Sequence, residues 1–300
     1  MYEQIASNKR KSFFLVLFFL CLIFLLTWIF GELTGLGTYG LVLAVVIACA
    51  MTLGSYWASD KIVLAISRAK PVKKEDYPYL YNVVEGLAIA AGLPKPRCYI
   101  IDDTAPNAFA SGRNPQNSVI VVTKGLLEKL NRAELEGVVA HEMAHIKNYD
   151  VLVQTLAVVM VGVVALLSDW ILRSFFWGGG RRRSRGKGGG SGGSGAAIFV
   201  VVALVLAVLS PLIAQLIRLA ISRKREFLAD ANGAYLTRYP PGLASALRKL
   251  AEDKEPLEAA NKATAHLYIV NPLKNIKGKM NVLFSTHPPI EERISALEKM

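Results

Sequence analysis

The chain is poor in charged residues and in cysteine. Charged residues make up 19% of its 300 residues, whereas soluble domains usually carry about a quarter. Its three cysteines show no metal-ligand spacing: Cys21 and Cys49 lie in apolar runs, and Cys98 stands alone in a polar region. We therefore expect neither a disulfide framework nor a cysteine metal site. A GxxxxGK[ST] phosphate-binding loop is also missing, which argues against self-contained ATP-driven unfolding.

Long apolar runs account for the shortage of charge. Residues 12–30, 36–57, 151–168 and 196–217 contain no charged side chain. A membrane-spanning helix needs about 20 mainly apolar residues, because lipid offers no partner for backbone polar groups. The first run exceeds the h-region of a signal peptide, about 7–15 residues, and has no evident cleavage site. The sequence therefore predicts an α-helical membrane protein with about four transmembrane helices.

Much of the net charge of +12 lies beside these runs. Lys9, Arg10 and Lys11 precede the first run, and five more basic residues between 61 and 74 follow the second. Because cytoplasmic flanks carry an excess of lysine and arginine, we expect a multi-pass protein of the cell (inner) membrane with its polar regions in the cytoplasm. No basic surface interleaved with stacking aromatics is evident, so the lipid bilayer, and not nucleic acid, is an expected partner.

The order of polar and apolar regions predicts one soluble domain interrupted by a membrane hairpin. Residues 1–60 would form two N-terminal transmembrane helices, and 61–150 the first part of the soluble domain. Residues 151–220 would form a second apolar pair around a Gly/Arg-rich linker at 178–195, and 221–300 would complete the domain. The pair either spans the membrane or dips in and returns. The five basic residues of the linker disfavour an external loop, but residues 196–217 are fully apolar and long enough to span, so four spans are predicted.

Local signals predict an α+β arrangement for the soluble domain. Residues 79–92 repeat apolar residues at helical spacing. The β-branched runs 97–101 and 118–122 predict a small antiparallel sheet. Asn131 and Glu134 form a capping-box pattern, which predicts the start of a helix. Further helices are expected over Arg218–Tyr235, Leu243–Asp253 and Pro289–Met300.

The segment 137–150, GVVAHEMAHIKNYD, holds two of the four histidines of the chain. On a helix, His141 and His145 lie on one face and can present two imidazoles to one metal ion. Glu142 lies about 100° around the helix, where it can reach a metal-bound water. This is the HExxH pattern, in which zinc takes the histidines and the glutamate is the general base. Its apolar neighbours predict a buried helix, where ionisable groups need partners such as a metal.

A catalytic zinc site needs a third protein ligand. No histidine follows at the HxxGxxH spacing, which leaves His266, His287 and the carboxylates as candidates. Glu226 in the segment REFLAD is the best of them, and Asp230 lies one turn further on the same helix face. Asp230 could accept the free N–H of a ligating imidazole. On spacing alone, REFLAD is equally compatible with an ordinary amphipathic helix beside the membrane.

Together these motifs resemble the HtpX group of membrane-integrated zinc metalloproteases, which are related to the CAAX prenyl endopeptidases. The resemblance covers nearly the whole chain: two N-terminal apolar runs, APNAFA at 105–110, HEMAH, an apolar pair, SRKREFLAD, and THPP at 286–289. It implies a zincin-like domain in which Glu226 is the third zinc ligand and Glu142 the catalytic base. It also implies that Asp230 hydrogen-bonds a ligating histidine.

The resemblance has two further implications for the site. The segment NAFA, formed by Asn107, Ala108, Phe109 and Ala110, resembles the strand beside the substrate cleft, to which an extended peptide could add by backbone hydrogen bonds. The THPP segment is expected near the site, which makes His287 a candidate hydrogen-bond donor to the oxyanion. His287 just before two prolines is also ordinary helix-start punctuation.

The sequence thus predicts a membrane-bound endopeptidase with one Zn²⁺ per chain that acts on protein or peptide substrates. The resemblance implies that it cleaves cytoplasmic segments of misfolded or damaged membrane proteins. One alternative is a prenyl-protein endopeptidase, but four spans are few to enclose a lipid-lined chamber. A second is a non-catalytic zinc-dependent membrane scaffold, which would have no use for Glu142. A small transporter is disfavoured because the apolar runs lack intramembrane charges.

Overall fold

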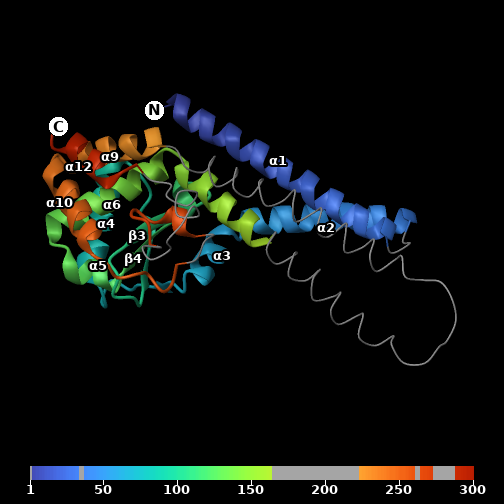
Figure 1. Ribbon diagram of the computed structural model, residues 1–300, viewed down its shortest axis with the longest axis horizontal. Coiled ribbons are helices and arrows are strands. Elements are labelled where there is room, and N and C mark those ends of the chain that lie inside the picture. The colour runs from blue at the N-terminus through green and yellow to red at the C-terminus, as the bar shows by residue number, and fades with distance from the viewer. Residues whose placement is uncertain (1, 34–36, 164–222, 261–263, 273–287) are drawn as a thin grey trace.

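The computed structural model describes residues 2–33, 37–163, 223–260, 264–272 and 288–300. The predicted linker, the fourth apolar run and residues 164–168 of the third lie outside the described residues, and so does His287. Within them, a head of helices around a small sheet is joined to a stem of two long helices (Figure 1).

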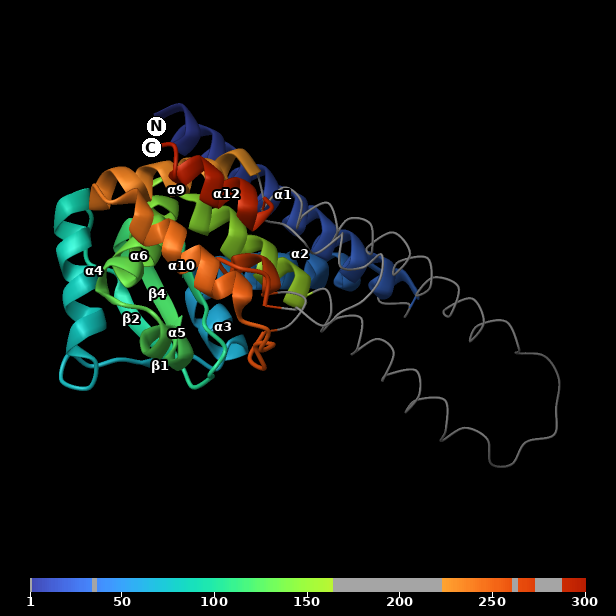
Figure 2. The ribbon, with the colours of Figure 1, turned by 60° about the vertical axis from the view of Figure 1, so that its left-hand side comes forward.

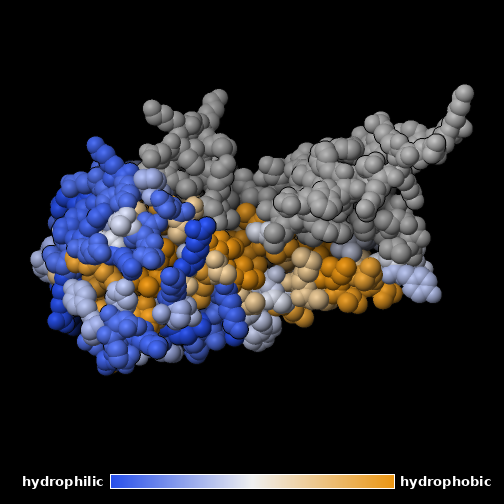
Figure 3. All heavy atoms as spheres, turned by 90° about the horizontal axis from the view of Figure 1, so that it is seen from below, coloured by the Kyte–Doolittle hydropathy of each residue, from blue (hydrophilic) through white to orange (hydrophobic). Residues whose placement is uncertain are grey.

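The stem consists of α1 (Tyr2–Leu33) and α2 (Gly37–Trp57), which pack side by side. Both expose large apolar side chains, among them Phe13 and Val46, and the stem surface is mainly apolar while the head is mainly hydrophilic (Figure 3). Among the described residues, α2 is the one helix long and apolar enough to cross a membrane by itself. The described residues therefore reproduce only part of the predicted four spans.

The head contains a four-stranded sheet in the order β1-β2-β4-β3. Its strands are β1 (Lys70–Pro71), β2 (Arg97–Ile101), β3 (Ala108–Gly112) and β4 (Ser118–Thr123). The prediction of an antiparallel sheet was wrong, because β2 pairs with β4 in parallel within a mixed sheet. The physical reason is that β3 lies between them in sequence, so the chain reverses twice before β4 and runs again in the direction of β2.

Both faces of the sheet are covered. Alternate strand residues such as Ala110 and Ile120 face the large core built with α4 (Pro78–Ala91) and α6 (Arg132–Lys147). Their neighbours, such as Phe109 and Val121, face a second core that includes residues of α3 (Ser59–Ile66). Since side chains alternate between the faces of a strand, burial on both faces explains why β3 and β4 are continuously apolar or small.

Helix α6, which carries the HEMAH segment, starts where the capping box predicts. Asn131 accepts a hydrogen bond from the Glu134 backbone N–H at 3.0 Å, and Glu134 accepts one from the Asn131 N–H at 2.8 Å. After α6 the chain bends by 83° into a further helix, Asp150–Val163. Tyr149 at this bend has a left-handed backbone conformation, with φ of 59°.

The described part of the head has four further α-helices. They are α5 (Lys124–Lys129), α9 (Arg223–Thr237), α10 (Pro240–Glu252) and α12 (Ile290–Leu297), and Figure 2 shows α9, α10 and α12 next to one another over α6. Gly233 of α9 lies against the backbone of α6: a Cβ atom at this position would lie 3.0 Å from the backbone nitrogen of His141. This close approach brings the side chains of α9 within reach of the histidines of α6.

Candidate metal centre

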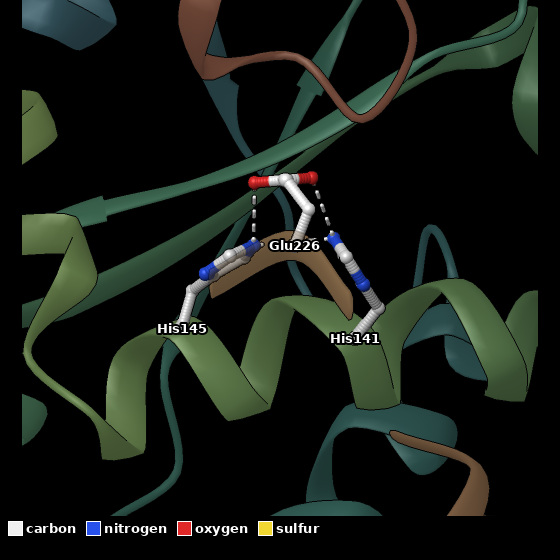
Figure 4. A group of neighbouring side chains, drawn as sticks. All are labelled: His141, His145 and Glu226. Carbon is white, nitrogen blue, oxygen red and sulfur yellow. Dashed lines mark hydrogen bonds and ion pairs between the residues drawn. The ribbon is translucent and has the colours of Figure 1, made fainter. Parts of the chain in front are cut away.

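Three buried side chains from two helices converge on one point. His141 and His145 project from α6 toward the carboxylate of Glu226, which comes from α9 (Figure 4). Their facing atoms are close: His141 Nε2 and His145 Nε2 are 3.2 Å apart, and Glu226 oxygens lie 3.8 Å and 3.5 Å from these two nitrogens. Four ligands about 2.0–2.2 Å from a tetrahedral zinc ion are about 3.3–3.6 Å apart, so the spacing suits such an ion.

The hydrogen bonds behind the two imidazoles explain why this cluster needs a cation. Each Nδ1 atom faces a carboxylate, at 2.9 Å for His141 and 3.1 Å for His145. A carboxylate accepts hydrogen bonds, so each Nδ1 carries the proton and each Nε2 presents a lone pair. When both imidazoles are neutral, two lone pairs and a carboxylate face one another in a buried space, an arrangement that a metal ion stabilises. The residues therefore fit a metal ion.

Asp230, one turn after Glu226, holds His141 and is itself held by an arginine. Arg293 of α12 donates to both Asp230 oxygens, at 2.7 and 2.8 Å, and to the Ile269 carbonyl at 3.1 Å. Burial alone would raise the pKa of Asp230, but the charge of Arg293 and the hydrogen bonds from Arg293 and His141 together outweigh it and lower that pKa to about 2. Burial lowers the pKa of His141 to about 4, so this imidazole is neutral and available as a ligand.

Asp150 holds the second histidine because the chain bends. On a continuous helix, Asp150 would lie about 7.5 Å beyond His145 and about 140° around the axis. The 83° bend at Tyr149 instead brings its carboxylate to 3.1 Å from His145 Nδ1. Burial alone would lower the pKa of His145, but the hydrogen bond to Asp150 and the charge of Glu226 outweigh it and raise that pKa to about 9. Without a metal, His145 therefore holds a second proton at Nε2, and a metal ion would bind in place of that proton.

The first helix of the stem reaches this arrangement. Asn8 of α1 donates hydrogen bonds at 2.8 Å to the other oxygen of Asp150 and to the Asn148 carbonyl. Arg225, which directly precedes Glu226, lies 3.3 Å from the same Asp150 oxygen. Asn8 and Asp150 are both buried. A continuous hydrogen-bonded path therefore connects α1 to the candidate metal ligand His145.

Glu142 lies outside the converging group but borders it. In the described part of the chain, the ligand atoms of His141, His145 and Glu226 lie within 4.8 Å of one another, and Glu142 does not belong to this group. The Glu142 carboxylate accepts a hydrogen bond from the backbone N–H of Ala110 in β3. Burial raises the pKa of Glu142 to about 7, although the charge of His145 offsets part of this effect. A carboxyl group with such a pKa can both accept and return a proton near neutral pH.

Comparison with known proteins agrees with this geometry. The model of peptidase family M48 matches residues 74–300. The chain belongs to this family. A protease HtpX homolog of Dictyoglomus turgidum is 50% identical over 299 residues, covering 100% of this chain and 94% of the relative. One of Listeria monocytogenes is 46% identical over 308 residues, covering 100% of both. These matches confirm the predicted HtpX resemblance and a metalloprotease.

A solved structure was found as well. The crystal structure of S. mikatae Ste24p is similar with a TM-score of 0.48 and 20% sequence identity, covering 99% of this chain and 67% of that one.

The strand predicted to bind substrate lies next to the active-site helix of this M48 peptidase. Asn107 directly precedes β3, and Ala108, Phe109 and Ala110 lie within it. β3 is the last strand of the sheet, but its outer edge contacts the chain itself: Ile269 donates its N–H to the Ala108 carbonyl at 3.0 Å. A peptide could pair with the whole of this edge only by displacing Ile269.

Sequence reasoning missed the residues that hold the metal-site histidines through long-range contacts. Arg293 occupies the position between Ile290 and Leu297 where an apolar stripe at helical spacing would run, and a charge in such a stripe signals a buried ion pair. Asn8 likewise begins the buried face of α1. Of the two histidines outside HEMAH, His266 is buried, with Nε2 3.4 Å from the Gln154 carbonyl oxygen.

Proposed function

We propose that the chain is a membrane-bound, zinc-dependent endopeptidase that cleaves cytoplasmic segments of misfolded or damaged membrane proteins. The observation that carries the proposal is the convergence of His141, His145 and Glu226 beside a buried glutamate, in a head attached to an apolar stem. Two imidazoles and one carboxylate are the ligand set of catalytic zinc sites that leave a fourth position open.

Each group of the site has a distinct task in peptide hydrolysis. When bound, zinc supplies positive charge that polarises the scissile carbonyl and lowers the pKa of a water to about 7. The Glu142 carboxylate takes the proton from the attacking water and delivers it to the leaving amine. The backbone N–H of Ala110 holds that carboxylate in place. His287 remains our candidate for the hydrogen-bond donor to the oxyanion.

The location of the catalytic centre supports a substrate at the membrane surface. Asp150, which holds His145, is hydrogen-bonded to Asn8. The uncharged run of α1 begins at Ser12, one helical turn or about 6 Å beyond Asn8. If the stem is embedded, the catalytic centre therefore lies close to the bilayer surface, where segments emerging from membrane proteins are within reach. The edge of β3 would hold such a segment in extended form.

The test uses the full chain reconstituted in lipid and loaded with zinc. Its substrate is a membrane-anchored protein with an unfolded segment on the exposed side, compared with the same segment detached from its anchor. We expect faster cleavage of the anchored form and loss of nearly all cleavage in Glu142→Gln, which removes the base but leaves the three ligands. Equal turnover by Glu142→Gln would rule out the assigned base, and equal cleavage of both substrates would rule out the membrane preference.

A further inference from the structure

A cavity of about 610 Å³ lies where the stem meets the head. It is bordered by α1, α2, Tyr149 at the bend and the loop that follows β3. Its volume lies within the range of about 300–1,000 Å³ that is typical of ligand sites. None of the groups that perform hydrolysis lines it, so the proposed proteolysis does not account for it.

Two cations line the cavity. Lys9 Nζ lies 4.5 Å from the centre of the Tyr149 ring, and the Arg113 guanidinium lies 4.6 Å from the centre of the Trp57 ring. Arg113 also donates to the Trp57 carbonyl at 2.9 Å. An ammonium has three N–H donors and a guanidinium five, so both cations retain donors for an anion. The aromatic rings fix the cations at the cavity wall.

Two hydroxyl groups deeper in the stem have no partner. Ser12 of α1 and Thr52 of α2 both line the cavity and are each only 4% exposed. Within the described part of the chain, neither hydroxyl oxygen has a hydrogen-bond partner. A buried hydroxyl without a partner costs about 1–3 kcal/mol. Protein atoms cover both oxygens, so a ligand with polar atoms would remove this cost only by displacing a neighbouring side chain.

The remaining wall of the cavity is apolar. Phe13, Val16, Leu53 and Leu152 form this apolar part of the lining. Along α1 the lining residues run from the cation Lys9 through the hydroxyl of Ser12 to the apolar Phe13 and Val16. A phospholipid has the matching order of a phosphate, ester oxygens and acyl chains, and Trp57 and Tyr56 in the same lining suit the membrane–water interface.

We propose that this cavity binds one anionic phospholipid, with its phosphate on Lys9 and Arg113 and its ester region beside Ser12 and Thr52. Two cations around one phosphate favour a headgroup with net negative charge over a zwitterionic one. The proposal rests on the membrane anchoring given above but not on proteolysis. The loss of catalytic activity in a Glu142→Gln protein would leave it untouched.

The experiment counts bound lipids on the purified full chain in detergent by native mass spectrometry, with phosphatidylglycerol, phosphatidylcholine or inorganic phosphate added separately. We expect saturable binding of one phosphatidylglycerol, at least tenfold tighter than phosphatidylcholine, and no binding of phosphate alone. Lys9→Ala combined with Arg113→Ala should weaken that binding at least tenfold. The matched control, Arg10→Ala with Lys61→Ala, removes two exposed cations that do not line the cavity and should leave it unchanged.

A second pair of changes tests the hydroxyl groups. Ser12→Ala combined with Thr52→Val should weaken phosphatidylglycerol binding several-fold, yet it should not lower the melting temperature of lipid-free protein, because neither hydroxyl has a partner to lose. If the control Arg10→Ala with Lys61→Ala lost as much lipid binding as Lys9→Ala with Arg113→Ala, the lipid would respond only to the general surface charge, and the proposal would be overturned. Equal binding of the two lipids, binding of phosphate alone, or displacement of the lipid by an uncharged apolar peptide would also overturn it.

Discussion

Removal of the Asn8 side chain should weaken metal binding at a site that Asn8 does not touch. Asn8 donates two hydrogen bonds of 2.8 Å, to Asp150 and to the Asn148 carbonyl, and Asp150 in turn holds His145 at 3.1 Å. Loss of a carboxylate that holds a ligating histidine typically costs 10–100-fold in metal affinity. Asn8→Ala leaves that carboxylate in place but frees one of its oxygens. We therefore expect a smaller loss of zinc affinity, about tenfold.

The measurement is zinc affinity of the full chain in detergent, by competition with a chelator, for a double-mutant cycle. Asp150→Ala should lower zinc affinity 10–100-fold. Adding Asn8→Ala to Asp150→Ala should lower it little further, because Asn8 acts through the Asp150 carboxylate that is already lost. The coupling energy would then be about 1.4 kcal/mol, the equivalent of tenfold. Ser12→Ala is the control, since Ser12 is buried one turn further along α1 and makes no hydrogen bond among the described residues.

Two results would refute the reasoning. If Asn8→Ala and Asp150→Ala lowered zinc affinity additively, Asn8 would act independently of Asp150. If Asn8→Ala lowered the melting temperature of metal-free protein but left zinc affinity unchanged, Asn8 would only attach α1 to the head.

Three further predictions concern the site and its supports. Glu226→Ala should remove most bound zinc, whereas His287→Ala should keep zinc and lower kcat by roughly 10²–10³ if His287 stabilises the oxyanion. Metal analysis and kinetics on both variants test this, and zinc lost from His287→Ala but kept in Glu226→Ala would contradict it. Arg293→Met leaves the buried Asp230 carboxylate without its cation, so the free energy of unfolding should fall by about 3–5 kcal/mol, and an unchanged denaturation midpoint would contradict the ion pair. Gly233→Ala places a Cβ 3.0 Å from the backbone nitrogen of His141 and should weaken zinc binding. Gly86→Ala, whose Cβ lies in open space on α4, should only stabilise that helix.

The parts of the fold that depend on nearby residues could be predicted from the sequence. The capping box at Asn131 predicted the start of α6, and α4 covers Pro78–Ala91 where residues 79–92 were expected to be helical. The spacing of four residues between His141 and His145 predicted their common face, and the structure brings Glu226 to both. Only helical periodicity and cap chemistry, which act within a few residues, were needed for the two helices and the common face of the histidines, whereas Glu226 was expected there from the HtpX resemblance.

Features that depend on distant segments could not be predicted in the same way. The direction of β4 relative to β2 depends on whether the chain between them forms a strand, and the small residues of β3 give a weak strand signal. The contact of Asn8 with Asp150 joins residues 142 positions apart. No periodicity within either segment carries that information.

Arg293 shows how such a long-range partner leaves a trace in the sequence even so. The stripe Ile290, Arg293, Ile294 and Leu297 has the spacing of a buried helix face, and its second member is a guanidinium. A buried arginine requires a carboxylate, because its charge cannot be removed by loss of a proton. Asp230 meets that requirement and thereby becomes fixed against His141 at 2.9 Å. The apolar pattern of α12 is thus interrupted at the residue through which this helix supports the metal site.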